Sequence, residues 1–176
     1  CVNLLSIKRQ VRGLADMQEM EIKARDVMET NFHTLLPQTT IGEAVQYFRE
    51  VGKQEGRRIF GMMVTSEQEE LVGMLSMYDI LLCISPKHVN IWGEMEDLEP
   101  IGLFDKALER AKYIQVGEIM STEVITVTPD THVLMIIDIM LKKHVRRIPV
   151  VEGQKVLGIV YIAPVFYQVL QRFWSE

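Results

Sequence analysis

A hydroxyl and a carboxylate stand three residues apart in the segment Gly73-Met74-Leu75-Ser76-Met77-Tyr78-Asp79, where an apolar strand is predicted to end and a helix to begin. The N-terminus of a helix presents unpaired N–H groups and the positive end of the helix dipole, which suit a phosphate. An ionised Asp79 only accepts hydrogen bonds, so it can hold both hydroxyls of a ribose, and Ser76 can donate to a phosphate oxygen. The same spacing also fits a capping box, in which Asp79 serves the helix backbone. By itself, the segment leaves both interpretations open.

A pair of arginines marks the second segment, His144-Val145-Arg146-Arg147-Ile148-Pro149-Val150, where a predicted helix ends and a buried strand begins. Exposed arginines at such a place commonly serve solubility or ion pairing. Two adjacent guanidinium groups also offer bidentate contacts to a phosphate. Arg57-Arg58-Ile59 resembles this segment, so we expect the two arginine pairs to occupy equivalent places.

Few other residues have the types or the spacing for chemistry. We find no nucleophile with a base, no pair of catalytic carboxylates and no P-loop, so we predict that the protein is not an enzyme. The side chains that most often bind metals show no ligand spacing, and we expect no metal site. They are His33, His88, His132, His144, Cys1 and Cys83.

The composition limits the partners of the chain. Its 176 residues carry a net charge of -5, with 48% hydrophobic and 24% charged residues, a balance that is typical of a globular protein. An acidic total gives no support for binding nucleic acid or an anionic membrane, so we expect neither. No apolar run approaches the roughly 18 residues that a membrane helix needs, and no signal-peptide pattern opens the sequence. With two unpaired cysteines, these features predict a cytoplasmic location.

Both chemically interesting segments belong to an internal repeat. Asp26–Thr30 resembles Glu118–Thr122, and a proline follows each at the same distance; further on, Leu71–Met74 resembles Val156–Ile159. The offset between the copies shrinks along the chain because the first copy has a longer helix end and a longer hairpin loop. Two copies of one supersecondary unit are therefore predicted.

Each copy is predicted as strand, helix, strand, strand, helix. In the first copy, Thr40-Ile41-Gly42-Glu43 fits a capping box and the apolar residues after it recur at helical spacing. Its elements are predicted at residues 33–36, from 41, at 59–64, 71–75 and 77–84. Those of the second copy are predicted at residues 124–127, 133–141, 147–151, 156–160 and 165–173.

Segments outside the repeats are a predicted N-terminal helix and an inter-repeat region that ends in an amphipathic helix from Leu103 to Ala111. The N-terminal stripe Leu4, Ile7, Val11 and Leu14 fits packing against the same chain or a dimer seam. The acidic cluster Glu94–Asp97 fits a solvated loop or a weak cation site. The predicted domains are 1–24, 25–85 for repeat 1, 86–117 for the linker and helix, and 118–176 for repeat 2.

The repeat separates the two interpretations of Ser76 and Asp79. At the equivalent place the second copy has Tyr161-Ile162-Ala163-Pro164, which supplies neither the Ser hydroxyl nor the acid, yet the same helix is predicted. Since the fold does not need these two side chains, the comparison favours a ligand.

The duplicated plan resembles the CBS-domain family, whose paired copies form a Bateman module. The segment Gly73–Asp79 looks like the family's glycine, two apolar residues, Ser/Thr, x, x, Asp nucleotide motif. The segment His144–Val150 is similar to the basic pair of nucleotide-binding members such as the regulatory subunit of AMP-activated protein kinase. The resemblance covers about residues 25–173. It implies an α/β fold of two βαββα repeats packed about a pseudo-twofold axis.

What the resemblance implies for function is a regulatory module that binds AMP, ADP or ATP in a cleft between the repeats, with or without Mg and with no required cofactor. Asp79 would hold the ribose; Ser76, Arg146 and Arg147 would hold the phosphates. The implied nucleotide-binding residues are Met74, Ser76, Tyr78, Asp79, Val124, Ile125, Arg146, Arg147 and Pro149. The module would signal by a change of conformation and would form a homodimer, as CBS pairs commonly do.

A quasi-symmetric second cleft would use Phe32, His33, Arg57, Arg58 and Tyr161. Pro164 replaces its aspartate, so we expect this cleft to be empty or weak. Two other functions stay open beside a nucleotide sensor. One is a structural or dimerisation module without a ligand, and the other is a sensor of S-adenosylmethionine, whose ribose Asp79 would serve equally.

Overall fold

The computed structural model describes residues 21–85 and 100–170. The chain forms two compact units: unit 2 is continuous, from residue 33 to 124, and unit 1 combines the segments on either side of it. Each unit therefore takes in the short helix that precedes the other repeat in sequence. The predicted N-terminal stripe and the acidic cluster at residues 94–97 lie outside the described residues.

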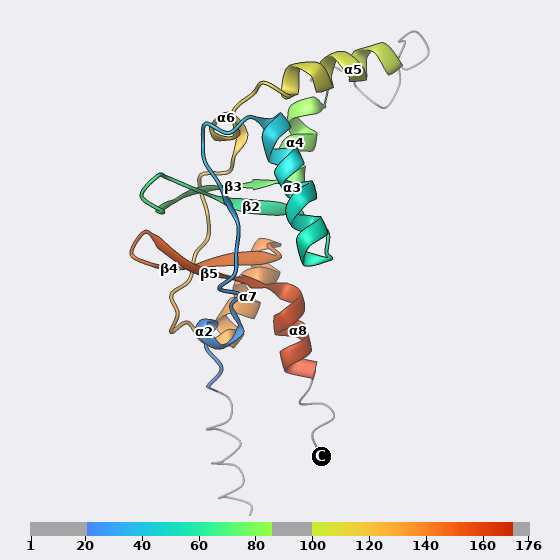
Figure 1. Ribbon diagram of the computed structural model, residues 1–176. Helices are drawn as coiled ribbons and strands as arrows, with labels where there is room; N and C mark the ends of the chain where they lie inside the picture. Colours follow the sequence, from blue (N-terminus) through green and yellow to red (C-terminus); the bar gives the residue numbers. More distant parts are fainter. Residues whose placement is uncertain (1–20, 86–99, 171–176) are drawn as a thin grey trace, which may run out of the picture. The chain divides into compact units, whose positions relative to one another are not determined.

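Unit 2 contains a mixed sheet of three strands in the order β1-β2-β3, of which Figure 1 labels β2 and β3. The first pair is parallel and the second antiparallel. Its elements are β1 (Thr34–Leu35), α3 (Ile41–Glu55), β2 (Gly61–Thr65), β3 (Leu71–Ser76), α4 (Met77–Ile84), α5 (Pro100–Ala111) and α6 (Val116–Ile119).

Unit 1 contains an antiparallel pair, β4-β5, and its helices (Figure 1). The predicted strand at residues 124–127 is wrong: in the part of the chain that the structure describes, only Val127 makes a parallel bridge, to Val150. Between Val127 and Ser121, which bridges to Met74 of β3, the described residues form no strand pairing. The elements are α2 (Ala24–Val27), α7 (Val133–Lys143), β4 (Arg147–Glu152), β5 (Lys155–Tyr161) and α8 (Ile162–Leu170).

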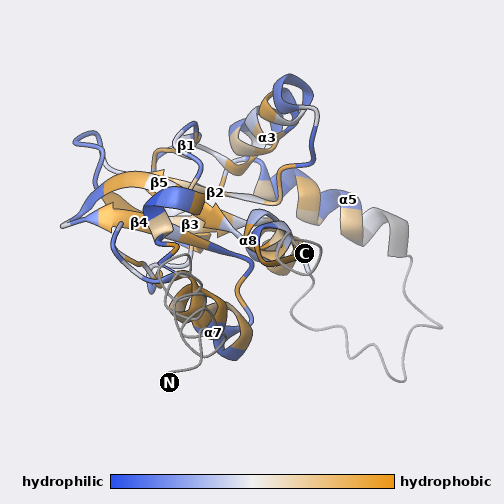
Figure 2. Cartoon of the chain, turned by 90° about the horizontal axis from the view of Figure 1, so that it is seen from below, coloured by the Kyte–Doolittle hydropathy of each residue, from blue (hydrophilic) through white to orange (hydrophobic). Residues whose placement is uncertain are grey.

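Each unit has its own apolar core, because the strands are apolar on both faces and the helices on one. Figure 2 shows the strands mainly in hydrophobic colours, while α3 and α7 carry both colours. The core of unit 2 includes Ile41, Val51, Val64, Leu75 and Val116. The core of unit 1 includes Ala24, Val133, Ile136, Val150 and Val160. Burial of such side chains is the main favourable term of folding.

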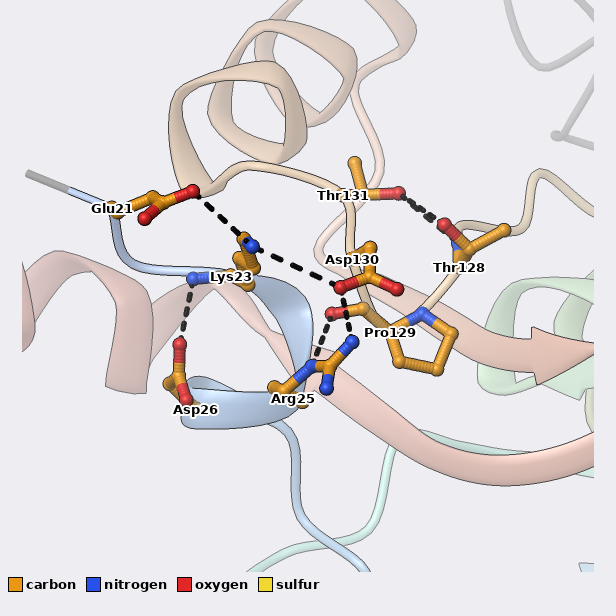
Figure 3. Close-up of polar contacts among 8 residues, drawn as sticks. All are labelled: Glu21, Lys23, Arg25, Asp26, Thr128, Pro129, Asp130 and Thr131. Carbon is orange, nitrogen blue, oxygen red and sulfur yellow. Dashed lines mark hydrogen bonds and ion pairs between the residues drawn. The ribbon is translucent and has the colours of Figure 1, made fainter.

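The short helix α2 is tied to the turn before α7 by main-chain and side-chain contacts within unit 1 (Figure 3). The N–H of Ala24 donates to the carbonyl of Thr131 at 2.8 Å, and that of Arg25 to the carbonyl of Pro129 at 3.1 Å. The guanidinium of Arg25 pairs with Asp130. Chain segments about a hundred residues apart in sequence thereby form one unit.

The predicted helices that fall within the described residues are confirmed, with one shift. The Thr40 capping box begins α3, and Gly56 ends it in the left-handed conformation (φ 64°) that glycine adopts without strain. Helix α8 begins at Ile162 rather than at Val165, with Pro164 in its first turn. Proline is tolerated there because no main-chain donor is needed at that place. None of the described helices is long and apolar enough to cross a membrane.

Candidate functional site

The turn from β3 into α4 brings Ser76 and Asp79 together in a complete capping box. The main-chain N–H of Ser76 donates to Asp79 Oδ2 at 2.7 Å, and the Ser76 hydroxyl donates to the same oxygen at 2.5 Å. In return, the main-chain N–H of Asp79 donates to Ser76 Oγ at 3.4 Å. The helix-cap interpretation is thus observed, and it uses one of the two carboxylate oxygens.

The second carboxylate oxygen of Asp79 faces Ser121. The Ser121 hydroxyl donates to Asp79 Oδ1 at 3.3 Å, a long hydrogen bond. Main-chain hydrogen bonds of 2.9 Å in both directions between Ser121 and Met74 fix this approach. Sequence reasoning did not select Ser121. Its place in the repeat, next to Met120 and one residue before Thr122, was the available signal.

Glycine at position 73 permits the approach of the segment that carries Ser121. A Cβ atom at Gly73 would lie 2.6 Å from Met120 Sδ and 3.0 Å from the carbonyl oxygen of Ser121, closer than such atoms normally pack. Unit 1 repeats the arrangement, since a Cβ at Gly158 would lie 2.8 Å from the carbonyl oxygen of Glu29. The glycine of the motif therefore serves close chain approach, not a special φ angle.

The remaining predicted residues of unit 2 are open to solvent to different degrees. Tyr78 is 69% exposed on the first turn of α4. Met74 and Val124 are half-buried. Unit 2 thus offers acceptor oxygens, an exposed aromatic ring and apolar side chains around the start of α4.

The basic pair lies in unit 1 at the start of α8. Arg147 pairs with Tyr161 across the β4-β5 ladder, and the carbonyl of Arg146 accepts from the N–H of Ile162 at 2.9 Å. Arg146 is exposed, Arg147 and Ile125 are half-buried, and Pro149 is fully buried in the core. Unit 1 thus places the main chain of two arginines beside a helix N-terminus, and the side chain of Pro149 contributes packing.

The strand registers show that the two arginine pairs are not equivalent. Arg147 opposes Tyr161 at the end of its ladder, as Gly61 opposes Ser76. The residue after each second strand then donates its N–H to the residue before the first strand. In unit 1, Ile162 donates to the carbonyl of Arg146, and in unit 2, Met77 donates to the carbonyl of Phe60. Phe60-Gly61 therefore corresponds to Arg146-Arg147, and the predicted equivalence of Arg57-Arg58 is wrong.

The cause is a difference in length between the two repeats. Val64 follows the first residue of α3, Ile41, by 23 residues, whereas Val150 follows the first residue of α7, Val133, by 17. The extra residues lengthen α3 and the loop after it. Arg57-Arg58 lies inside this longer connection. Its similarity in sequence to Arg146-Arg147 therefore does not reflect an equivalent position in the fold.

Two members of the predicted second cleft are bound to one carboxylate. His33 Nε2 lies 3.2 Å from Glu55 Oε1, and Arg57 Nε donates to Glu55 Oε2 at 2.6 Å. The other ring nitrogen of His33, Nδ1, lies 3.1 Å from the hydroxyl of Tyr47, whose ring meets the imidazole edge to face. The side chain of Glu55 is 18% exposed. This network stabilises the end of α3 within unit 2.

No group of three or more metal-binding side chains lies together among the residues that the structure describes. Cys83 is a free, half-buried thiol on α4. The predicted residues therefore supply hydroxyl and carboxylate groups in unit 2, which suit a ribose, and guanidinium groups in unit 1, which suit an anionic group.

Residues 24–86 and 116–163 match the family described as "CBS domain". The two matches cover more than half of the chain, and the chain belongs to the CBS-domain family. The mixed α/β fold is that of a tandem CBS pair, as the resemblance implied.

A curated relative is the "CBS domain-containing protein CBSX1, chloroplastic" of Arabidopsis thaliana, 28% identical over 155 residues that cover 84% of this chain. The chain spans only 61% of the length of that relative. The relative's name places it in the chloroplast, so a cytoplasmic location of this protein stays a prediction.

Two solved structures share the fold. The structure of CBSX2 of Arabidopsis thaliana in complex with AMP is 22% identical, with a TM-score of 0.61, and the match covers 86% of this chain and 98% of that one. The cytosolic domain of the Mg2+ channel MgtE in complex with ATP is 21% identical, with a TM-score of 0.62 over 84% of this chain and 49% of that one.

Proposed function

We propose that the chain is a non-enzymatic regulatory module that binds AMP, ADP or ATP through residues of both repeats. Asp79 holds the ribose through Oδ1, with Ser121 beside it. Arg146 and Arg147 hold the phosphates, and Met74, Val124 and Ile125 contact the adenine. Binding shifts the population between two conformations, because a ligand stabilises the form that it binds more tightly.

The observation that carries the proposal is that the two oxygens of the Asp79 carboxylate have different partners. Oδ2 accepts both hydrogen bonds from Ser76, while Oδ1 accepts a single long one from Ser121. An ionised carboxylate has about four acceptor positions, so Asp79 can cap α4 and still accept ribose hydroxyls. We expected Ser76 to donate to a phosphate, but its hydroxyl donates to Asp79 instead. Its part in the proposal is to orient the carboxylate.

The complexes of CBSX2 with AMP and of MgtE with ATP support an adenine nucleotide as the ligand class. S-adenosylmethionine has the same ribose and would use Asp79 equally, but it has no phosphate for Arg146 and Arg147. A module without any ligand would need neither arginine for binding. A titration with each compound separates the three alternatives.

Asp79→Ala is the variant that tests the proposal, and the capping box of α3 supplies a matched control. In that box Thr40 donates to Glu43 Oε2 at 2.8 Å from both its main-chain N–H and its hydroxyl, a close copy of the Ser76–Asp79 geometry. Both Asp79→Ala and Glu43→Ala should therefore lower the Tm, because each removes the acceptor that its cap residue uses.

Only Asp79→Ala should weaken nucleotide binding. Loss of a charge-assisted contact to two hydroxyls costs about 1.5–3 kcal/mol, so the Kd measured by calorimetry should rise roughly 10- to 100-fold. Arg147→Ala should weaken ATP more than adenosine, since it acts on phosphate. Equal effects of Asp79→Ala and Glu43→Ala on affinity would show that Asp79 is a helix cap only, and a parent protein that binds no adenosyl compound would refute the proposal.

A further inference from the structure

A cavity of about 560 Å³ opens on the surface of unit 2. The second half of α3, the loop at residues 56–60 and the first residue of α4 line it. None of the nine residues in the predicted nucleotide set contributes to its lining. Its volume falls within the range of small-molecule sites in proteins.

Four cationic side chains line this pocket, and no acidic one does: Arg49, Lys53, Arg57 and Arg58. Arg57 is compensated, because its Nε donates to Glu55 at 2.6 Å. Within the described part of the chain the other three make no ion pair, and all three are exposed. Cations near the end of a helix favour its dipole, which explains one charge of this kind but not a cluster of them around one hollow.

Apolar side chains form the rest of the lining. Phe60 is 48% exposed and Met77 47% exposed, next to the partly buried Phe48. Large apolar surface left in water beside a cluster of guanidinium groups is unfavourable unless something covers it. A guanidinium also stacks well on an aromatic ring. The combination suits a ligand with an apolar body and an anionic group.

The pocket is specific to the first repeat. Gly52, Lys53, Gly56 and Arg57 belong to the longer end of α3 and the longer loop after it, which the second repeat lacks. At the position of the exposed Phe60, the second repeat has Arg146. The extra residues thus do more than lengthen a connection, because they form much of the lining of the pocket.

We propose that this pocket binds a small organic anion, a carboxylate or sulfonate carried on an aromatic or branched apolar body. Arg49, Lys53 and Arg58 bind the anionic group, and Phe60 and Met77 contact the apolar part. The pocket shares no lining residue with the proposed nucleotide set, so its occupant is expected to bind without displacing a nucleotide.

Fluorescence titration of the full chain with anilinonaphthalene sulfonate tests the proposal, with the uncharged phenylnaphthylamine as the matched probe. The sulfonate should bind at least tenfold more tightly than the uncharged compound. Arg58→Glu and, independently, Lys53→Glu should each weaken the sulfonate about tenfold and leave the uncharged probe within twofold. Phe60→Ala should weaken both probes. A thermal melt shows that each variant is folded.

Lys143→Glu is the matched charge control, since Lys143 is an exposed lysine in the last turn of α7, the counterpart of α3. It should leave both probes within twofold of the parent, and so should Tyr113→Ala, which removes an exposed ring that does not line the pocket. Equal binding of the two probes, or an equal effect of Lys143→Glu and Arg58→Glu, would overturn the proposal.

Competition with ATP separates this inference from the proposed function. Saturating ATP should not displace the sulfonate, and Arg58→Glu should bind ATP with the affinity of the parent. Displacement by ATP would contradict a separate site. Absence of nucleotide binding to the parent, with sulfonate binding intact and sensitive to Arg58→Glu, would refute the nucleotide proposal alone.

Discussion

The carboxylate of Asp79 combines an observed role in capping a helix with the binding role that we propose. Its Oδ2 closes the capping box with Ser76, and its Oδ1 lies toward the exposed Ser121. Sequence spacing alone presents these as competing interpretations. In the structure they are compatible, because the two oxygens of a carboxylate point in different directions and carry separate lone pairs.

Glu43 in the matching box of α3 predicts a dependence of stability on pH. The main-chain N–H of Thr40 and then its hydroxyl hold the pKa of Glu43 below the ordinary value of 4.5. A carboxylate with a lowered folded pKa stabilises the fold above its unfolded pKa, and this stability is lost as the pH falls through the folded pKa. The Tm difference between the parent and Glu43→Gln should therefore be largest near neutral pH and vanish in acid.

A series of thermal melts from neutral pH to below 4.5 measures this difference. In Glu43→Gln the side-chain amide oxygen can still accept the hydrogen bonds from Thr40, so the substitution removes the charge and keeps the geometry of the box. A difference in Tm that stays constant through the acid range would contradict the assignment of the pKa shift to Thr40.

Among the elements, β3 and the segment after α6 pack closely against each other at Gly73. The two main-chain hydrogen bonds between Met74 and Ser121 require the chains to approach within the space that a Cβ would occupy. Met120 is flexible, but the carbonyl oxygen of Ser121 belongs to the main chain and moves only with its segment. Gly73→Ala should therefore destabilise the fold by about 1–3 kcal/mol, the usual cost of overpacking.

Gly102 on α5 is the control for this substitution. Among the described residues, no atom beyond its chain neighbours and its own helix backbone lies within 4 Å of the position that its Cβ would take, and alanine has a higher helix propensity than glycine. Gly102→Ala should stabilise the protein by roughly 0.5–1 kcal/mol. Denaturant unfolding measures both changes, and a neutral or stabilising Gly73→Ala would show that the close approach is not required.

For the whole molecule, the exposed apolar faces of α4 and α8 support the proposed homodimer. Leu81 and Leu82 are 55% and 61% exposed on α4, and Phe166 and Tyr167 are 56% and 64% exposed on α8. Isolated apolar residues on a surface need no explanation, but repeated ones along the exposed face of a helix suggest a partner. A second copy of the chain is the partner that we propose.

Light scattering at tens of micromolar should give twice the chain mass of 20.3 kDa. Leu81→Glu and Phe166→Glu should each shift the mass toward the monomer, because a charge buried in an apolar interface is costly. Tyr113→Glu, at a side chain that is 79% exposed and lies outside both helices, should leave the dimer intact. A parent protein with the mass of a single chain would contradict the proposal.

The elements of the fold followed from local features of the sequence. Capping residues at Thr40 and Ser76, and apolar residues at helical or alternating spacing, act over a few neighbouring residues, so they predict helices and strands without knowledge of the partner segments. The internal repeat followed in the same way from matching residues. Asp79 was recognised as special because the second copy lacks its equivalent, and Arg147 because two adjacent guanidinium groups can bind a phosphate.

Only the tertiary structure decided which segments belong together and which residues correspond. The short helix α2 joins unit 1 through the carbonyls of Pro129 and Thr131, about a hundred residues away, and no local pattern encodes such a partner. The register of each ladder shows that Phe60, not Arg57, corresponds to Arg146. An insertion is not apparent from the short similar segments on either side of it. Main-chain hydrogen bonds, by contrast, fix which residues face each other across a ladder. A slip by one residue would turn every side chain to the opposite face.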